Sequence, residues 1–179
     1  MIKSKKDFNE KILIINKEPI LAAYVDIPQM DAICQDFWGN GGKYSYNYYS
    51  SIISQNLSYV YKEKNDEVTA FCLVRYDSKK NQVGICLFSV KKNYQGKGLG
   101  KSLIKFCIDN CRKKGLDNFY LHTAVTNIPA INLYLLLGFR VVKTILNYYC
   151  NDAPPDNDAF LMILKNDNKI IDKNSKKMN

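Results

Sequence analysis

Residues 93–103, NYQGKGLGKSL, place three glycines within five positions directly before a helix-forming stretch. Glycine loses more conformational freedom on folding than any other residue, so this cluster indicates that the backbone itself must approach something closely. The N-terminus of a helix offers unpaired amide N–H groups and the positive end of the helix dipole. Phosphate is therefore the first candidate ligand, and a strand, this loop and a helix are expected to follow one another in the fold.

The spacing of this loop excludes two common phosphate-binding motifs. No GxxxxGK[ST] pattern is present, and the glycines do not have the GxGxxG spacing of dinucleotide-binding loops. A pattern of the form [QR]xxGx[GA] does fit, through Gln95, Gly98 and Gly100. Because unrelated chains match so short a pattern by chance, the rest of the sequence must support the interpretation.

Hydrophobic periodicity predicts an α/β fold of strands and helices in mixed order. Strands are expected at 19–25, 57–63, 67–77, 82–90, 118–125, 139–149 and 158–164, and helices at 26–37, 44–56, 98–114 and 128–138. Some of the strands are joined by short hairpin connections and others by crossovers, which predicts a mixed sheet. We therefore expect one α/β domain with a mixed, mostly antiparallel sheet of about seven strands flanked by about four helices.

Length and charge limit the function classes. A chain of 179 residues with 46% hydrophobic residues is long enough for one domain with a core, which we place at 19–165, after an N-terminal extension at 1–18. A basic tail at 166–179 is expected to be disordered. Neither a secretory signal nor a membrane-spanning segment is evident. The net charge of +9 comes without a nucleic-acid-binding motif, so we expect no specific nucleic-acid partner and no membrane partner.

The six cysteines are scattered and form no CxxC pair. Most of them lie within apolar runs, as free core thiols do in a reducing compartment. We therefore expect a cytoplasmic protein that has neither disulfides nor a metal site.

The segment LHTAVTNIPAINLYLLLGF at 121–139 adds a second motif, N-x-x-A-I-x-L-Y-x-x-x-G-F. Together with YQGKGLGKSL, this segment resembles the GNAT superfamily of N-acetyltransferases over residues 19–165. Two further stretches, NFYLHTAVTN at 118–127 and NYYCNDAPPDNDAFLM at 147–162, are similar to protein N-terminal (Nα) acetyltransferases. The resemblance implies a single GNAT-type domain, acetyl-CoA as cosubstrate, and a peptide or protein N-terminus as acceptor.

Coenzyme A carries a pyrophosphate, which the glycine loop can bind through main-chain amides. The residues expected to form this anion site are Gln95, Gly96, Lys97, Gly98, Leu99, Gly100 and Lys101. The resemblance implies that the pantetheine arm pairs along Phe88, Ser89 and Val90, and that Asn127 lies against the cofactor chain. Lys97 and Lys101 could also meet its phosphates, although solvated lysines are an equal alternative.

Direct attack of an amine on a thioester requires a base, an oxyanion donor and an acid for the leaving thiolate. His122 is the only histidine and shares one face of its strand with Tyr120. The resemblance makes His122 the base, acting through a water, and Tyr134 the acid; a structural strand histidine and a core aromatic are the alternatives. A main-chain N–H near Phe88 is the expected oxyanion donor.

The acceptor is expected to meet five aromatic side chains: Phe37, Trp38, Tyr120, Tyr148 and Tyr149. Phe37 and Trp38 form an apolar wall in FWGNGG, where the family has a proline-containing turn. Tyr148 and Tyr149 flank the substrate backbone, and since one of them alternates inward along the strand, at least one is expected to be structural. Gly84 stands where the similar enzymes have a tyrosine that assists the histidine, so His122 would work alone or with Tyr120.

Two other functions stay open. A polyamine-type small-molecule acetyltransferase would use an acidic pocket, for which Asp152, Asp156 and Asp158 are available on one loop. A coenzyme-A-binding module with little turnover would be consistent with the glycine at position 84. A ribosome or an auxiliary subunit is a possible further partner in the Nα interpretation.

Overall fold

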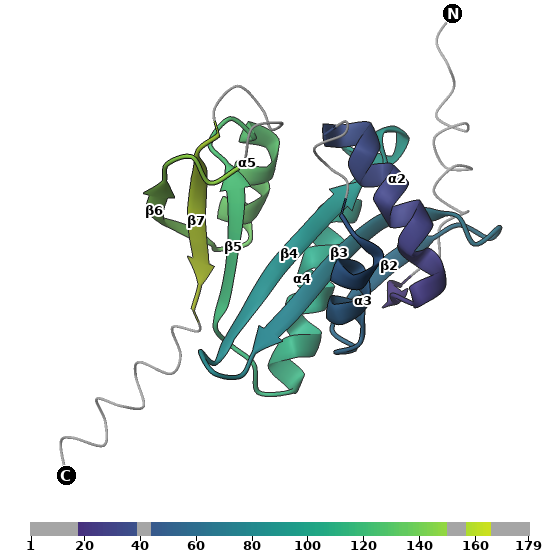
Figure 1. Cartoon of the computed structure of the whole chain (residues 1–179), viewed down its shortest axis with the longest axis horizontal. Coiled ribbons are helices and arrows are strands. Elements are labelled where there is room, and N and C mark those ends of the chain that lie inside the picture. Colours follow the sequence, from purple (N-terminus) through teal and green to yellow (C-terminus); the bar gives the residue numbers. More distant parts are fainter. Residues whose placement is uncertain (1–17, 39–43, 150–156, 166–179) are drawn as a thin grey trace, which may run out of the picture. The chain divides into compact units, whose positions relative to one another are not determined.

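The computed structural model describes residues 18–38, 44–149 and 157–165, and Figure 1 shows their ribbon. Within these ranges, seven strands form one mixed sheet in the order β1-β2-β3-β4-β5-β7-β6, together with four α-helices, which confirms the predicted α/β fold. The predicted N-terminal extension and basic tail lie outside the described residues, except for Glu18. The described residues divide into two compact units, one made of those up to Leu73 together with Leu87–Cys107, and the other of Val74–Cys86 together with those from Ile108 onward.

The strands are β1 Ile20–Leu21, β2 Tyr59–Lys62, β3 Val68–Asp77, β4 Gln82–Val90, β5 Phe119–Ala124, β6 Arg140–Ile145 and β7 Ala159–Leu164. The helices are η1 Tyr24–Asp26, α2 Ile27–Trp38, α3 Tyr46–Ile53, η3 Lys92–Tyr94, α4 Leu99–Lys113 and α5 Ile128–Leu136. β4 and β5 pair in parallel. β1–β2, β2–β3, β5–β7 and β6–β7 pair antiparallel, as predicted for a mostly antiparallel sheet.

Two predicted strands are much shorter in the structure. The strand expected at 19–25 stops at Leu21, because the chain turns into η1 and the Ala23 amide donates to the Asp26 carboxylate at 2.9 Å. The strand expected at 139–149 stops at Ile145, because Asn147 takes a φ of +51° and its amide donates to Asp158 Oδ1 at 2.9 Å. Tyr148 therefore lies in a loop, and the expected strand alternation of Tyr148 and Tyr149 is wrong.

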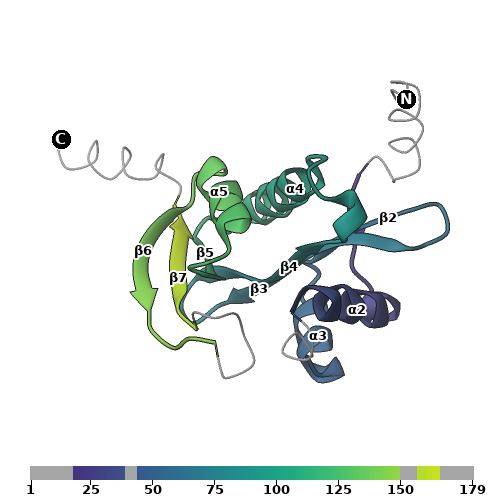
Figure 2. The ribbon, with the colours of Figure 1, turned by 90° about the horizontal axis from the view of Figure 1, so that it is seen from above.

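In the first unit, Figure 2 shows α2 and α3 on one side of β2 and β3 and α4 on the other. The α4 contacts are specific, since the Tyr59 and Phe106 rings meet edge to face at 5.0 Å and the Tyr61 and Ser102 hydroxyls lie 2.9 Å apart. Large apolar side chains fill the interior of this unit: Met30, Tyr49, Ile52, Val60, Phe71, Leu73 and Leu103. Burial of this apolar surface is the main stabilising contribution to the unit.

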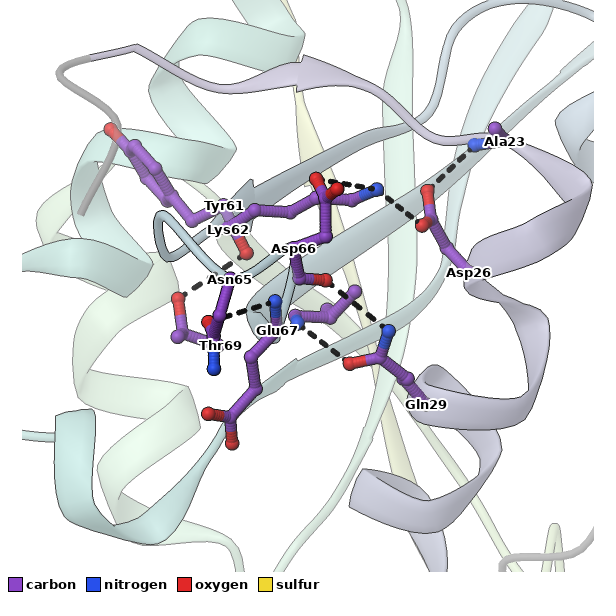
Figure 3. A network of polar contacts seen from close by, with 10 residues as sticks. Ala23, Asp26, Gln29, Tyr61, Lys62, Asn65, Asp66, Glu67 and Thr69 are labelled. Carbon is purple, nitrogen blue, oxygen red and sulfur yellow. Dashed lines mark hydrogen bonds and ion pairs between the residues drawn. The ribbon is translucent and has the colours of Figure 1, made fainter. Parts of the chain in front are cut away.

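A polar network ties the start of α2 to the β2–β3 turn (Figure 3). Lys62 Nζ lies 2.6 Å from Asp26 Oδ1, and both side chains are buried. Gln29 accepts from the Val68 amide at 2.9 Å and donates to the Asp66 carbonyl at 3.3 Å. Because removing one partner of a buried ion pair leaves an uncompensated charge, this network fixes how α2 docks on the hairpin.

In the second unit, β5 shows the alternating burial that its sequence predicts. Phe119, Leu121 and Thr123 are buried, whereas Tyr120 and His122 on the opposite face are half-buried. α5 begins at the Asn127 cap, whose side chain accepts from the Ala130 amide at 3.3 Å, and is followed by Gly138 at a φ of +90°. Figure 2 shows α5 over one face of β5 and β7. Tyr120 and His122 lie on the face of β5 opposite to Phe119, Leu121 and Thr123.

The five cysteines that the structure describes are free thiols, four of them buried: Cys34, Cys72, Cys107 and Cys111, with Cys86 half-buried. This agrees with the prediction of core thiols. Burial raises the pKa of the Cys34 thiol to about 11, so this cysteine stays protonated and inert. In the described part of the chain, no helix is both long and apolar enough to cross a membrane.

Candidate active site

The glycine loop begins directly after β4 and is anchored at its start by three hydrogen bonds. The Lys91 amide donates to the Thr69 carbonyl at 2.8 Å, and the Tyr94 amide donates to the Lys91 carbonyl at 2.8 Å. Gln95 reaches back with its side chain and donates to the Val90 carbonyl at 2.8 Å. The predicted pattern residue Gln95 thus closes the loop onto the end of the strand, which fixes the path of the following backbone.

Gly96 and Gly98 adopt φ values of +70° and +83°, a conformation that side chains with a Cβ rarely take. A Cβ placed on either residue would meet no protein atom within 4 Å, so the requirement for glycine at both positions is conformational, with open space beside the backbone. The first helical hydrogen bond runs from the Ser102 amide to the Gly98 carbonyl at 3.0 Å. The amides of Leu99, Gly100 and Lys101 precede it and point out of the helix start. An exposed backbone with a positive dipole end fits a diphosphate.

Two acidic side chains hold this loop on the β2–β3 turn. The Lys91 ammonium pairs with the Glu67 carboxylate, and the Tyr94 hydroxyl donates to the Glu63 carboxylate. The hydrogen bond and charge of Lys91 lower the pKa of Glu67 below its ordinary value, so this carboxylate is ionised at neutral pH. Sequence reasoning missed both carboxylates, since nothing in the local pattern links positions 63 and 67 to the loop.

The loop lysine nearest the glycines has an internal partner. Lys97 Nζ donates to the Asn93 carbonyl at 2.8 Å and lies 5.4 Å from the centre of the Tyr94 ring. The remaining predicted cofactor residues of this unit, Phe88, Ser89 and Val90, are the last three of β4. The described pairing of β4 with β5 covers Val83 to Ile85, ahead of this segment.

In the second unit, an aromatic cluster surrounds His122. The Tyr148 ring stacks on the imidazole with centroids 4.5 Å apart and planes 19° apart. The Tyr120 ring meets the imidazole edge to face, at 5.9 Å and 80°. The loop carrying Tyr148 is held by Asp158, which accepts from Asn147, and by the Tyr149 amide, which donates to Asn157 at 2.9 Å.

Burial changes the acidity of the cluster. It lowers the pKa of the His122 imidazole below its ordinary value of 6.5, so the ring is neutral at physiological pH and can accept a proton. It also raises the pKa of the Tyr148 hydroxyl, with smaller contributions from Tyr120 and Cys86. His122 is thus a weak neutral base beside a protonated phenol.

Beside this cluster, β4 carries Gly84, whose register partner on β5 is Tyr120. A Cβ at Gly84 would lie 2.9 Å from both Cζ and Oη of Tyr120, closer than real side chains approach. The sequence marks Gly84 only as the place of an absent tyrosine. Its contact with Tyr120 depends on the parallel register of β4 and β5, for which no local sequence signal exists.

The other predicted residues lie on the helices. Tyr134 is buried in α5 with its ring 5.9 Å from Phe139, and Asn127 caps the same helix. Phe37 and Trp38 end α2 with their rings 5.9 Å apart, and Phe37 is half exposed. Phe37, Trp38 and the glycine loop belong to the first unit, whereas the His122 cluster, Asn127 and Tyr134 belong to the second. The structure thus brings together the loop residues within one unit, and Tyr120, His122 and Tyr148 within the other.

The chain is similar to several known proteins. N-alpha-acetyltransferase 30 of Saccharomyces cerevisiae is 36% identical over 80 residues, which are 45% of this chain and 43% of that protein. The chain spans about half the length of the curated relatives it matches.

Solved structures match over more of the chain. The ribosomal-protein-S18-alanine N-acetyltransferase of Escherichia coli is 25% identical, has a TM-score of 0.70, and is matched over 83% of this chain and 92% of its own. A chain of the NatC complex bound to Gag peptide and CoA is 24% identical with a TM-score of 0.74, over 86% and 99% of the two chains, and shows the shared fold.

The sequence model of the acetyltransferase (GNAT) family matches residues 27–139, which run from the first residue of α2 to the residue that precedes β6. The matched range contains the glycine loop, the His122 strand and all of α5, the elements that carry the two sequence motifs. This protein belongs to the acetyltransferase (GNAT) family.

Proposed function

We propose that this protein transfers the acetyl group of acetyl-CoA to the α-amino group of peptide or protein N-termini. The observation that carries the proposal is the state of His122, whose half-buried imidazole has a pKa lowered below its ordinary value of 6.5 and is therefore neutral at physiological pH. A neutral imidazole of this kind is a weak base. It suits an acceptor amine that already loses its proton easily.

An α-amino group has a pKa of about 7.7–8.0, so roughly a quarter of it is free amine at about pH 7.4. A lysine ammonium, with a pKa of about 10.4, offers roughly a thousandth. His122 can therefore serve an N-terminus, whereas lysine side chains and polyamines need a stronger base. The names of the related N-alpha-acetyltransferase and of the ribosomal-protein-S18-alanine N-acetyltransferase support the same acceptor.

The proposed reaction is a direct transfer. The amine nitrogen forms a bond to the acetyl carbon, and the carbon–sulfur bond of the thioester breaks. His122 accepts the amine proton through a water, and Tyr134 returns a proton to the departing sulfur. The role of Tyr134 rests on the family resemblance, while its burial against Phe139 supports a structural function equally well.

The glycine loop is the proposed binding site for the diphosphate of acetyl-CoA, which supplies the activated acetyl group. Gly96 and Gly98 have positive φ values, and the space beside them is open. The amides of Leu99 and Lys101 would donate to phosphate oxygens at the start of α4. Phe88, Ser89 and Val90 would pair with the pantetheine arm by main-chain hydrogen bonds.

Thiol release from acetyl-CoA tests the acceptor class directly. The acceptors are a peptide with a free N-terminus, the same peptide N-terminally blocked but carrying an internal lysine, and spermidine. We expect release with the first alone. Activity on spermidine without activity on peptides would show that the protein is a polyamine acetyltransferase instead. Tight binding of the cofactor without turnover would show that it is a coenzyme-A-binding module.

The polyamine alternative depends on an acidic pocket. Of the three loop carboxylates considered for it, Asp152 and Asp156 lie outside the described residues. The third, Asp158, accepts the Asn147 amide and holds the loop that carries Tyr148. Within the described part of the cluster, His122 meets tyrosines rather than carboxylates, which favours an α-amine over a polycation.

We place this reaction in the cytoplasm, which the free buried thiols of the described residues support. An auxiliary subunit or a ribosome contact is part of the same proposal. The chain shares its fold with a chain of the NatC complex, and this shared fold is the only support for an auxiliary subunit.

A further inference from the structure

The contact between Gly84 and Tyr120 has a functional consequence for His122. Gly84 lies within β4, where an alanine is conformationally allowed, so its glycine is needed only for space. The space is filled by the hydroxyl end of the Tyr120 ring, 2.9 Å from where a Cβ would stand. A single methyl group at position 84 would therefore have to move this ring.

The Tyr120 ring also touches His122. Both residues lie on the same face of β5, and their rings meet edge to face, with centroids 5.9 Å apart and planes at 80°. Tyr148 covers the imidazole face at 4.5 Å. The imidazole is thus bounded by two rings: Tyr148 is carried by the loop that Asp158 holds, and Tyr120 lies over Gly84.

We propose that Tyr120 is a positioning residue for His122, and that the missing side chain at Gly84 is what allows it to be one. The hydroxyl end of the Tyr120 ring lies over β4 at Gly84, and the ring packs edge to face with the imidazole, which keeps the base oriented and partly shielded from water. The expected effect on the reaction rate rests on the proposed function. The expected effect on the orientation and pKa of His122 does not, and it can be tested without substrate.

The titratable groups of this cluster come from three elements. Tyr120 lies on β5 and Tyr148 in the loop after β6, and both rings meet His122. Cys86 lies on β4 two residues beyond Gly84 and acts on the pKa of Tyr148. On β7, the register partner of His122 is Leu161, which does not titrate. Burial lowers the pKa of His122, and the Tyr120 ring is one of the two rings that cover the imidazole.

Because the chain has one histidine, a proton NMR titration of its imidazole reports His122 without ambiguity and without any substrate. We expect the pKa of His122 to rise toward 6.5 in Gly84→Ala, because displacement of the Tyr120 ring uncovers the imidazole. Tyr120→Ala should raise it as well. In the double variant, Gly84→Ala should add nothing, since no ring remains to be displaced.

An unchanged titration in Gly84→Ala, or a Gly84→Ala effect that persists in full without the Tyr120 ring, would overturn the inference. Gly84→Ala alone could fold poorly because of the steric conflict, which the double variant with Tyr120→Ala removes. A higher melting temperature in the double variant than in Gly84→Ala would then itself report the Gly84–Tyr120 contact. Thermal unfolding of all four proteins therefore accompanies the titration.

Kinetics separate this inference from the proposed function. With an N-terminal peptide as acceptor, Gly84→Ala should lower kcat at least about threefold while the KM for acetyl-CoA changes less than about twofold. If no variant or parent acetylates peptides, the proposed function fails and the NMR titration still decides the inference. If the parent is active and both the titration and kcat are unchanged in Gly84→Ala, the inference fails alone.

Discussion

Gly98 in the glycine loop and Gly84 in β4 are required for opposite reasons. Gly98 takes a φ of +83° with no protein atom near its missing Cβ, so its glycine provides a conformation. Gly84 has ordinary strand geometry with a tyrosine ring 2.9 Å from its missing Cβ, so its glycine provides space. The first leaves room for a ligand, and the second leaves room for a side chain of the protein itself.

The difference shows two ways of building a functional site. The glycine loop is made mainly of backbone amides, so a local pattern of residues encodes it. The His122 cluster is made of side chains from β5 and from the loop after β6, and only the packed fold brings them together. Variants at the two sites should therefore affect different measurements: cofactor affinity at the loop, and proton transfer at the cluster.

The largest expected effect is that of His122→Ala. Removal of the base should lower kcat at least about tenfold near pH 7. Affinity for CoA, measured by calorimetry, should stay nearly unchanged because the loop does not use this side chain. An unchanged turnover rate would remove His122 from the mechanism.

Gly98→Ala should weaken CoA binding at least about tenfold, because an alanine at positive φ costs about 1–2 kcal/mol and its methyl group would stand where the diphosphate binds. Gly115→Ala is the matched control, since Gly115 has a φ of +77° and equally open surroundings, but lies after α4. We expect both variants to lose similar stability in thermal unfolding, while only Gly98→Ala loses CoA affinity. Equal CoA affinity in the two variants would contradict the loop assignment.

Loosening the anchors of the loop should have a smaller effect on the same quantity. Glu67→Gln removes the charge that pairs with Lys91, and should weaken CoA binding about two- to fivefold by letting the loop start move. Asp77→Asn removes the charge that pairs with the exposed Lys80 at 4.0 Å, away from the loop, and serves as the control. A loss of CoA affinity equal in the two variants would show that the anchor has no specific role.

The smallest expected effect concerns stability and pH. The pKa of His122 is lowered in the folded protein, so the unfolded chain binds a proton first as the pH falls below 6.5. The free energy of unfolding should therefore decrease from pH 6.5 downward, and less so in His122→Gln. Urea unfolding of both proteins at pH 7.5 and 5.5 measures this. An equal loss of stability in the two proteins would contradict a lowered pKa of the half-buried imidazole.

Sequence patterns predicted the order of elements, the glycine loop and the face of β5 that carries His122, because these depend on local periodicity and on glycine conformation. They failed at the strand expected up to 149, where the turn at Asn147 is set by a distant carboxylate, Asp158. They also missed the loop anchors Glu63 and Glu67, since both contacts join residues more than twenty positions apart. Side-chain pairs that depend on packing leave little trace in a single sequence.

The position of the transferred acetyl group tests the proposed function most directly. A peptide with a free N-terminus and one internal lysine would be incubated with acetyl-CoA and the protein, and the acetylated site read by tandem mass spectrometry. We predict acetylation of the α-amino group alone, because His122 is a weak base that an N-terminal amine suits and a lysine ammonium does not. Acetyl found on the lysine side chain, with the α-amino group unmodified, would contradict this function.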